Sequence, residues 1–278
     1  MPYFETPADG TRLHYVDYGP ADGPVMLFVS GSYFASDMWE YQMLPLAEEG
    51  YRCVGLDRRG HGRSDDVWGG FELDSLADDL YGLMEHLDLR GLTLVGHSIG
   101  TAEIVRSLTR HGAERVARAV LVAGTVPGLV RSEENPDGWD PEALQAFNDT
   151  FRRDRAAFFA DGAHAFFALD LPGNDLSPAY VQYMVQRCHG STARAGTALG
   201  RVVACLDLGA DELGKVDLPV LVVHGTHDVS APLELTGRRS AALLPGGTLK
   251  VYENGGHGLF ATHADQLNAD LRKFMADT

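Results

Sequence analysis

Cysteine is scarce in this 278-residue chain, and the three that are present show no motif spacing. Cys53, Cys188 and Cys205 form neither a CxxC pair nor a metal-ligand pattern. The sequence therefore predicts no disulfide framework and no cysteine-based metal site. Cys53 lies in an apolar run and is interpreted as a small buried hydrophobic residue. This cysteine usage favours a reducing compartment.

Basic residues are also few. The chain has 23 Lys and Arg against 39 Asp and Glu, which gives a net charge of −16. Such a charge repels nucleic-acid phosphates and anionic membrane surfaces. No apolar run reaches the roughly 18 residues of a membrane-spanning helix. Residues 1–10 also lack the basic and apolar regions of a signal peptide. We therefore expect a cytoplasmic protein without nucleic-acid or membrane partners. The sequence does not decide whether the protein forms a homo-oligomer.

Short apolar runs alternate with amphipathic helical patterns along most of the chain. Buried strands of a parallel sheet are typically continuous apolar runs, and these are expected at residues 25–29, 51–56, 92–95, 118–122, 220–223 and 248–252, after a hairpin that includes residues 12–18. Helical patterns fall at residues 37–48, 74–89, 99–111, 232–243 and 264–275. This alternation predicts an α/β fold with a mostly parallel sheet and helices on both faces.

The pattern changes between about residues 127 and 208, where no strand-like run occurs. Helical segments are expected at residues 141–160, 177–189 and 191–206. We interpret residues 127–208 as a helical cap inserted into an α/β core, and the core as residues 1–126 and 209–278.

Residues 96–100 read Gly-His-Ser-Ile-Gly, between an expected strand and an expected helix. This G-x-S-x-G pattern is typical of a nucleophile elbow, in which the serine sits on a sharp turn. The turn places the Ser98 hydroxyl at the carboxyl end of the sheet, where open α/β sheets bind ligands. A chance match in a glycine-rich chain is the alternative, and the strand and helix on either side favour the elbow.

A serine nucleophile requires a base, and the base requires a carboxylate that orients it. In this type of fold the chain order is serine, acid, histidine. Asp228 is the only acid directly after the strand at 220–223, and His257 follows the strand at 248–252 between glycines. We therefore predict a triad of Ser98, Asp228 and His257. The alternative for the last two is an acidic loop and a solvated histidine.

Other histidines and acids compete for these roles. His224 and His227 are expected to shape the loop around Asp228, and His97 is expected to point away from the site. Asp57 also follows a strand, but it belongs to the stretch DRRGHGRS. We interpret that stretch as an ion-paired structural loop rather than as part of the site.

The oxyanion of an acyl-transfer reaction requires two preorganised donors. The backbone N–H of Ile99 is the first candidate, because it follows the nucleophile. The second is the N–H of Ser32, in the loop Ser30-Gly31-Ser32-Tyr33-Phe34 after the strand at 25–29. The hydroxyls of Ser30 and Ser32 have two alternative roles, which are ordinary turn hydrogen bonds or donation to the substrate.

Aromatic residues near these motifs are candidates for an apolar substrate pocket. They are Tyr33, Phe34, Trp39 and Phe260, together with Phe158, Phe159, Phe166 and Phe167 of the insertion. The alternative for each is simple packing in the core or cap.

At this point the sequence resembles the cofactor-free haloperoxidase, perhydrolase and arylesterase branch of the α/β-hydrolases. The resemblance runs almost end to end and is weak only in the insertion. Its most characteristic stretches are LDRRGHGRSD (56–65), RHGAERVARAVLV (110–122), LPVLVVHGTHD (218–228) and SAALLPGGTLKVYENGGHGLFATHADQLNADLRKF (240–274). The resemblance places the nucleophile, acid and base on Ser98, Asp228 and His257, and the oxyanion donors on Ser32 and Ile99. It implies an enzyme without metal or cofactor.

Two departures from the family pattern stand out. The family usually has His-Gly, an aromatic residue and Pro where this chain has Ser30-Gly31-Ser32-Tyr33. Peracid-forming and halogenating members generally carry that proline, so its absence disfavours perhydrolysis. The elbow also ends in Gly100-Thr101 where Gly-Gly is common.

The leading functional hypothesis is a serine hydrolase that acts on a small carboxylic ester or lactone through an acyl-enzyme. The substrate is expected to carry an apolar acyl or aromatic part. The same triad also serves perhydrolases and haloperoxidases, lactamases and C–C bond hydrolases. A hypothesis from another class is a non-hydrolytic ligand-binding member, in which Ser30 in place of the usual histidine leaves the oxyanion hole poorly formed.

Overall fold

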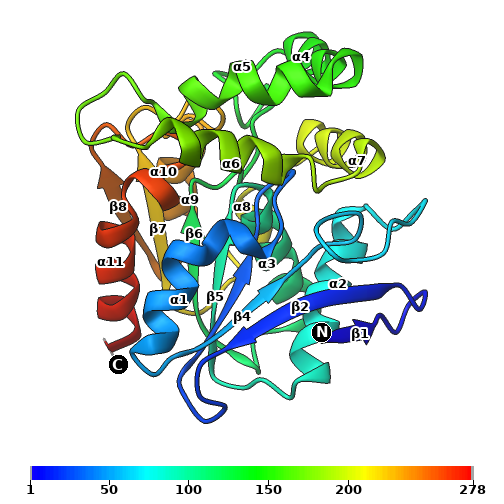
Figure 1. Ribbon diagram of the computed structural model, residues 1–278, viewed down its shortest axis with the longest axis vertical. Coiled ribbons are helices and arrows are strands. Elements are labelled where there is room, and N and C mark those ends of the chain that lie inside the picture. The colour runs from blue at the N-terminus through cyan, green and yellow to red at the C-terminus, as the bar shows by residue number, and fades with distance from the viewer. Residues whose placement is uncertain (1, 277–278) are drawn as a thin grey trace.

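The computed structural model describes residues 2–276. Within this range the strands form one eight-stranded sheet in the order β1-β2-β4-β3-β5-β6-β7-β8 (Figure 1). The hairpin pair and its neighbour are antiparallel, and the remaining pairs are parallel. The strands are β1 (Tyr3–Glu5), β2 (Arg12–Tyr18), β3 (Val25–Val29), β4 (Arg52–Leu56), β5 (Leu92–His97), β6 (Val116–Val122), β7 (Val220–Gly225) and β8 (Gly247–Tyr252).

The mostly parallel sheet of an α/β fold, expected from the apolar runs, is therefore confirmed. Every residue of β5 and β7 is buried, as expected for central strands covered on both faces. Alternate side chains of β3 enter two separate cores: Leu27 and Val29 join one, while Met26 and Phe28 join the other. The period-2 alternation of a strand explains this division.

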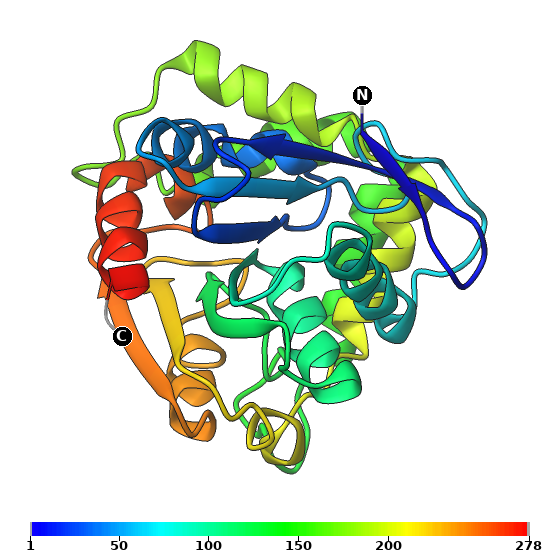
Figure 2. The same cartoon turned by 90° about the horizontal axis from the view of Figure 1, so that it is seen from below.

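Helices cover both faces of the sheet. Figure 2 places α1 (Glu40–Glu48) and α11 (Ala264–Ala276) on one side, and α2 (Leu73–His86), α3 (Ile99–His111) and α9 (Gly237–Leu243) on the other. The apolar faces of α2 and α3 pack into one core, and those of α1 and α11 into the second. The 3-10 turn η1 (Ser36–Trp39) precedes α1, and two further helices, α8 (Ala210–Leu213) and α10 (Leu259–Thr262), are short.

The chain between β6 and β7 consists of helices and loops, and its strand-like pairing is one isolated bridge between Val130 and Trp139. Its longer helices lie across the carboxyl ends of the strands in Figure 1. They are α4 (Pro141–Arg153), α5 (Arg155–Phe167), α6 (Pro178–Cys188) and α7 (Ala193–Ala204). We call this segment the helical insertion. Within residues 2–276 no helix has both the length and the apolarity that a membrane crossing requires.

Two expected helix boundaries are wrong. The single helix expected at 141–160 is two helices, because Asp154 leaves the helical conformation at φ −150° and its carboxylate caps the N–H of Ala157 instead. The helix expected from 232 begins at Gly237, because Thr236 bonds the carbonyls of Ala231 and Pro232 through its hydroxyl.

Candidate active site

Ser98 lies on the sharp turn between β5 and α3. Its φ of 55° and ψ of −123° are unusual for a residue with a side chain and mark a strained backbone. The turn brings α3 directly against β3, since a Cβ built on Gly100 would lie 2.7 Å from the carbonyl oxygen of Val29. Glycine at position 100 is therefore required by close backbone approach.

Hydrogen bonds hold this strained turn in place. The N–H of Ser98 donates to the carbonyl of Val122 at 3.1 Å. The Ser98 carbonyl accepts from the N–H of Thr101 at 3.0 Å and from the Thr101 hydroxyl at 2.6 Å. Thr101 is fully buried. The residue that departs from the Gly-Gly pattern thus contributes a second donor to the turn.

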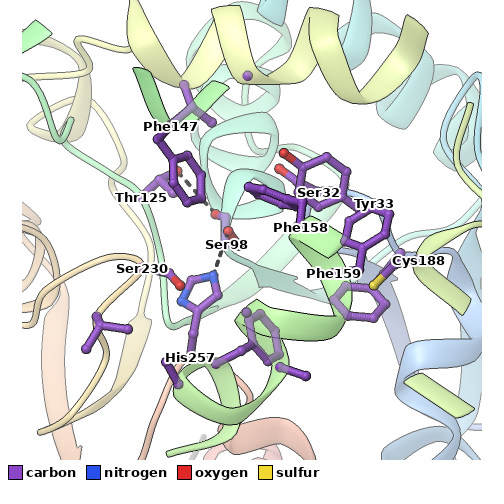
Figure 3. A pocket seen from close by; sticks show the side chains of 18 of the residues that line it. Ser32, Tyr33, Ser98, Thr125, Phe147, Phe158, Phe159, Cys188, Ser230 and His257 are labelled. Atoms are coloured by element: carbon purple, nitrogen blue, oxygen red, sulfur yellow. Dashed lines mark hydrogen bonds between the residues drawn. The ribbon is translucent and has the colours of Figure 1, made fainter. Parts of the chain in front are cut away.

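The structure brings the three predicted side chains into one hydrogen-bonded chain. Nε2 of His257 lies 3.0 Å from Oγ of Ser98, and a dashed line marks this hydrogen bond in Figure 3. Nδ1 of His257 lies 2.8 Å from Oδ2 of Asp228. An ionised carboxylate can only accept a hydrogen bond, so Nδ1 of His257 must carry the proton that it donates to Asp228. Nε2 is then free to accept the proton of the serine hydroxyl. All three residues are buried, with Ser98 and His257 both at the wall of a cavity.

The Asp228 carboxylate is held by its own loop as well as by His257. Oδ1 accepts from the N–H groups of Ser230 at 2.9 Å and Ala231 at 2.8 Å. Nε2 of His224 lies 3.3 Å from Oδ2 and donates to the Ala231 carbonyl at 2.6 Å. Burial on its own would raise the pKa of Asp228. The interactions of the carboxylate with His257 and His224 outweigh this effect and lower the pKa. Asp228 is therefore ionised at neutral pH.

His97 does not point away from the site, so that expectation is wrong. It lines the cavity, and its ring centroid lies 4.7 Å from that of His257. Its Nε2 donates to the His257 carbonyl at 2.9 Å. Burial lowers the pKa of His97 to about 3, so the ring is neutral. Its Nδ1 faces Gly31, where a Cβ would come within 2.4 Å of that nitrogen.

The two predicted oxyanion donors belong to loops that meet beside Ser98. Ser32 lines the same cavity as Ser98, and Ile99 is the first residue of α3. Within residues 2–276 neither N–H donates to a backbone carbonyl. The Ser30 hydroxyl donates to the carbonyl of Ala35 at 2.8 Å, and the residue is 2% exposed. Of the two alternatives for Ser30, the structure therefore favours the turn hydrogen bond.

Arg58 connects the Ser30–Gly31 loop to the helix that follows the serine. Its Nη2 donates to the Ser30 carbonyl at 2.6 Å and its Nη1 to the Gly31 carbonyl at 3.3 Å. Its Nε donates to Glu103 of α3 at 2.7 Å, and both side chains are almost completely buried. Burial raises the pKa of Glu103, and the Arg58 charge acts against that rise. We call this pair the Arg58–Glu103 clamp.

The rest of the DRRGHGRS stretch is the ion-paired loop that the sequence predicted. Arg59 donates from Nε and Nη2 to the Asp79 carboxylate at 2.7 Å each. Asp57 accepts from Ser36 and lies 3.0 Å from Nδ1 of His14. Sequence reasoning missed that Arg58, unlike its neighbour Arg59, touches the loop of the site.

The cavity beside Ser98 has a volume of about 400 Å³ and a mostly apolar wall. Tyr33 and Phe34 lie in this wall, and the insertion contributes Phe147, Phe158, Phe159, Phe166 and Phe167, several of which are labelled in Figure 3. Phe147 and Val229 are the most exposed of the apolar lining residues, at 52% and 58%. They mark the side on which the cavity meets the surface.

Two of the predicted pocket residues lie elsewhere. Trp39 and Phe260 are completely buried and do not line the cavity. They pack against each other and against the far side of His97, at centroid distances of 5.2 to 6.2 Å. Although they are close to the motifs in sequence, they lie behind the site, where they support His97 and make no contact with the cavity.

Several cavity residues were not found from the sequence. Thr125 and Ser230 carry hydroxyls in the wall, and Cys188, Met184 and Val185 come from α6. Ser230 follows Asp228 by two residues, which is the one signal that pointed to it. Among residues 2–276 no group of three or more His, Cys, Asp or Glu side chains is arranged to hold a metal ion.

The sheet order, the serine turn and the strand-end positions of the acid and histidine define an α/β-hydrolase. The model of the alpha/beta hydrolase fold family matches residues 24–264, so the chain belongs to this family. The resemblance inferred from the motifs is confirmed.

Relatives of known name match almost the whole chain. It is 36% identical over 272 residues to the non-heme chloroperoxidase CPO-A1 of Kitasatospora aureofaciens, covering 97% of this chain and 98% of that protein. It is also 36% identical over 275 residues to the bifunctional esterase/perhydrolase DCH of Acinetobacter calcoaceticus, covering 98% and 99%. The bromoperoxidase from Bacillus anthracis has a TM-score of 0.92 and 30% identity over 99% of both chains.

Proposed function

We propose that this α/β-hydrolase is a serine hydrolase for small carboxylic esters or lactones that carry an apolar acyl or aromatic part. The observation that carries the proposal is the hydrogen-bonded chain Ser98–His257–Asp228 at the wall of an apolar cavity. A hydroxyl in contact with an imidazole, itself held by a carboxylate, is the arrangement that nucleophilic catalysis requires.

In the proposed reaction Oγ of Ser98 attacks the carbonyl carbon while Nε2 of His257 takes the hydroxyl proton. Asp228 holds the imidazole in the required tautomer and stabilises the imidazolium that forms. The N–H groups of Ser32 and Ile99 donate to the developing oxyanion. His257 then returns its proton to the leaving alcohol, and the same histidine activates the water that hydrolyses the acyl-enzyme.

The wall of the cavity supports an apolar substrate group. A volume of about 400 Å³ is within the range of small-molecule sites. Burying apolar surface contributes about 25 cal/mol per Å², and the aromatic side chains of the insertion offer such surface. We propose that residues 127–208 act as a cap that covers the acyl or aromatic part of the substrate.

Perhydrolysis is the second candidate, and the name of the Acinetobacter relative, an esterase/perhydrolase, favours it. Hydrogen peroxide would replace water in the second step and release a peracid. Tyr33 stands where peracid-forming members generally carry proline, so we rank hydrolysis first.

A panel of p-nitrophenyl esters from acetate to octanoate tests the proposal. The wild-type protein should hydrolyse at least one of them with saturation kinetics, and Ser98→Ala should lose the activity. A fluorophosphonate reagent should label wild type and not Ser98→Ala. A wild-type protein that neither reacts with the reagent nor hydrolyses any ester contradicts the proposal. Peracid formation on adding peroxide to the same assays would bring perhydrolysis to first rank.

A further inference from the structure

A second hollow lies outside the active-site cavity, between the helical insertion and the loop before α2. Its volume is about 630 Å³. Residues of α4 and α7 and the first residue of α5 form one side, and the loop at 68–72 forms the other. Its lining consists of Trp68, Gly69, Phe71, Glu72, Phe151, Arg152, Arg155, Ala193, Arg194, Thr197, Ala198 and Arg201. We call it the arginine hollow.

The charge in the arginine hollow is opposite to that of the whole chain. Four arginines line it, with Glu72 as the single acidic residue of the lining, in a protein whose net charge is −16. Most other arginines of the described chain are ion-paired with carboxylates. Within residues 2–276 the four in the hollow are in no ion pair. Arg155 and Arg194 each donate one N–H to a backbone carbonyl, of Ser191 and Val67. The remaining guanidinium donors of the four arginines are available to an anion from solution.

An exposed tryptophan forms the other part of the hollow. Trp68 is 86% exposed, which is unusual for so large an apolar ring. The Arg194 guanidinium lies over the ring at 3.8 Å from its centroid, and Nη1 of Arg194 donates to the Val67 carbonyl at 2.6 Å. Arg194 thus fixes Trp68 in one orientation. An extended area of the ring stays open to a ligand, and a planar group gains by stacking on it.

We propose that the arginine hollow binds an organic phosphate that carries a planar aromatic ring. The ring stacks on Trp68, and the phosphate is held by the guanidinium groups of α4 and α7. Phosphate suits such a cluster better than a single carboxylate, because its charge is higher and it offers three terminal oxygens to the forked donors of arginine.

The arginine hollow is separated from the ester site by two stacked aromatic side chains. Phe151 lines the hollow and stacks on Tyr33 with ring centroids 5.0 Å apart. Tyr33 in turn lines the active-site cavity. A ligand in the hollow would therefore contact the insertion and the core loop together without entering the cavity of Ser98. The binding proposal does not depend on ester hydrolysis.

Calorimetric titration of the intact protein with adenosine monophosphate at low ionic strength tests the proposal. We expect saturable one-to-one binding, with adenosine alone and inorganic phosphate alone each at least about tenfold weaker. Arg152→Ala and Arg201→Ala should each weaken binding by about tenfold, the scale of one charge-assisted contact. Raising the salt concentration should weaken it further.

Two matched variants separate a site from diffuse charge. Arg153→Ala removes the neighbouring exposed arginine of the same helix, which does not line the hollow, and it should bind like wild type. Trp68→Ala should abolish the advantage of adenosine monophosphate over phosphate, while Trp68→Phe should keep it. Ser98→Ala should bind unchanged.

Three results would overturn the proposal: no saturable binding of adenosine monophosphate, an equal loss in Arg153→Ala and Arg152→Ala, or a ring preference that survives in Trp68→Ala. The side chains of Trp68, Arg152, Arg153 and Arg201 are exposed, and Ser98→Ala removes one hydroxyl at a buried position, so a melting temperature close to wild type should verify that each variant is folded.

Discussion

The two walls of the active-site cavity are held by different forces. On the core side, Ser98, His257 and Asp228 are fixed by short buried hydrogen bonds to side chains and backbone. On the insertion side, Phe158 contacts the rings of Phe147, Phe151, Phe159 and Tyr33 edge to face. Hydrogen bonds are directional, whereas ring contacts tolerate repacking.

This difference suggests a division of labour in the proposed mechanism. Proton transfer and oxyanion binding require atoms placed to within about 0.5 Å, which a hydrogen-bonded wall provides. Selection among apolar substrate groups requires only a matching volume. Substitutions on the core wall should therefore affect kcat, and substitutions on the insertion wall should affect the choice of substrate.

The largest effect is expected for Asp228→Asn. The amide cannot hold His257 in the tautomer that accepts the serine proton, so kcat should fall by about 10⁴-fold with little change in KM. Ester hydrolysis by wild type and variant at equal concentration measures this. Asp211→Asn, at an exposed position of α8, is the control and should be unchanged. A loss below tenfold in Asp228→Asn would contradict the role of Asp228.

The Arg58–Glu103 clamp should give the next largest effect. Removing one charge alone would leave the other buried and unpaired, so the test variant replaces both Arg58 and Glu103 by methionine. Replacing a whole buried ion pair by apolar residues often leaves a protein stable. Without Arg58 the carbonyls of Ser30 and Gly31 lose their donor, and the N–H of Ser32 loses its fixed direction. We expect kcat to fall by about 10- to 100-fold, part of what loss of an oxyanion donor costs.

The same motif supplies the control for this clamp. Arg59 and Asp79 form an equally buried pair that makes no contact with the Ser30–Gly31 loop. Replacing both by methionine should change thermal stability without changing kcat. Affinity for a boronic acid transition-state analogue should fall in parallel with kcat/KM for the Arg58–Glu103 variant alone. Equal kinetic losses in the two double variants would show that the Arg58–Glu103 clamp has only a structural role.

The sequence predicted most of the core wall because its residues follow from chain order. Strand and helix patterns bracket Ser98, and parallel strands end at one edge, so Asp228 and His257 could be expected there. The Arg58–Glu103 clamp joins residues 45 positions apart, and no local pattern reports such a contact. The contact of His97 with the site was also not predicted. His97 is the last residue of β5, so strand alternation gives its face, but no local pattern shows that His257, 160 positions further along, packs on that face.

The insertion was less predictable for a related reason. Its helices were recognised, but periodicity alone did not show the break at Asp154. Aromatic residues pack equally well in a core and in a pocket wall. Trp39 and Phe260 were therefore expected in the cavity, while the structure places them behind His97.

A pH experiment tests whether His97 belongs to the core wall. Burial lowers the pKa values of His97 and His61 to about 3. An unfolded histidine binds its proton near pH 6.5, so each residue makes the folded state less stable as pH falls from about 6.5 towards 3. His97→Phe and His61→Phe should each flatten this loss of unfolding free energy, measured by urea denaturation at several pH values.

Kinetics should then separate the two histidines. His97 donates to the His257 carbonyl and packs on its ring, while His61 lies against the Arg59 carbonyl. We expect kcat to fall by several-fold, about 1 kcal/mol for one lost hydrogen bond, in His97→Phe alone. Unchanged kcat in His97→Phe would remove His97 from the set of positioning residues.

The smallest effect on rate, and the clearest on selectivity, is expected on the insertion wall. Phe158→Ala enlarges the cavity without touching Ser98, His257 or Asp228, so kcat for p-nitrophenyl acetate should stay within about twofold. A longer acyl chain gains room, and kcat/KM for octanoate relative to acetate should rise by about 10-fold, the scale of one to two methylenes. Phe274→Ala, on the core helix α11, should leave the ratio unchanged. If the ratio is constant while kcat collapses, the insertion wall also positions the reacting groups, and the two walls do not differ in function.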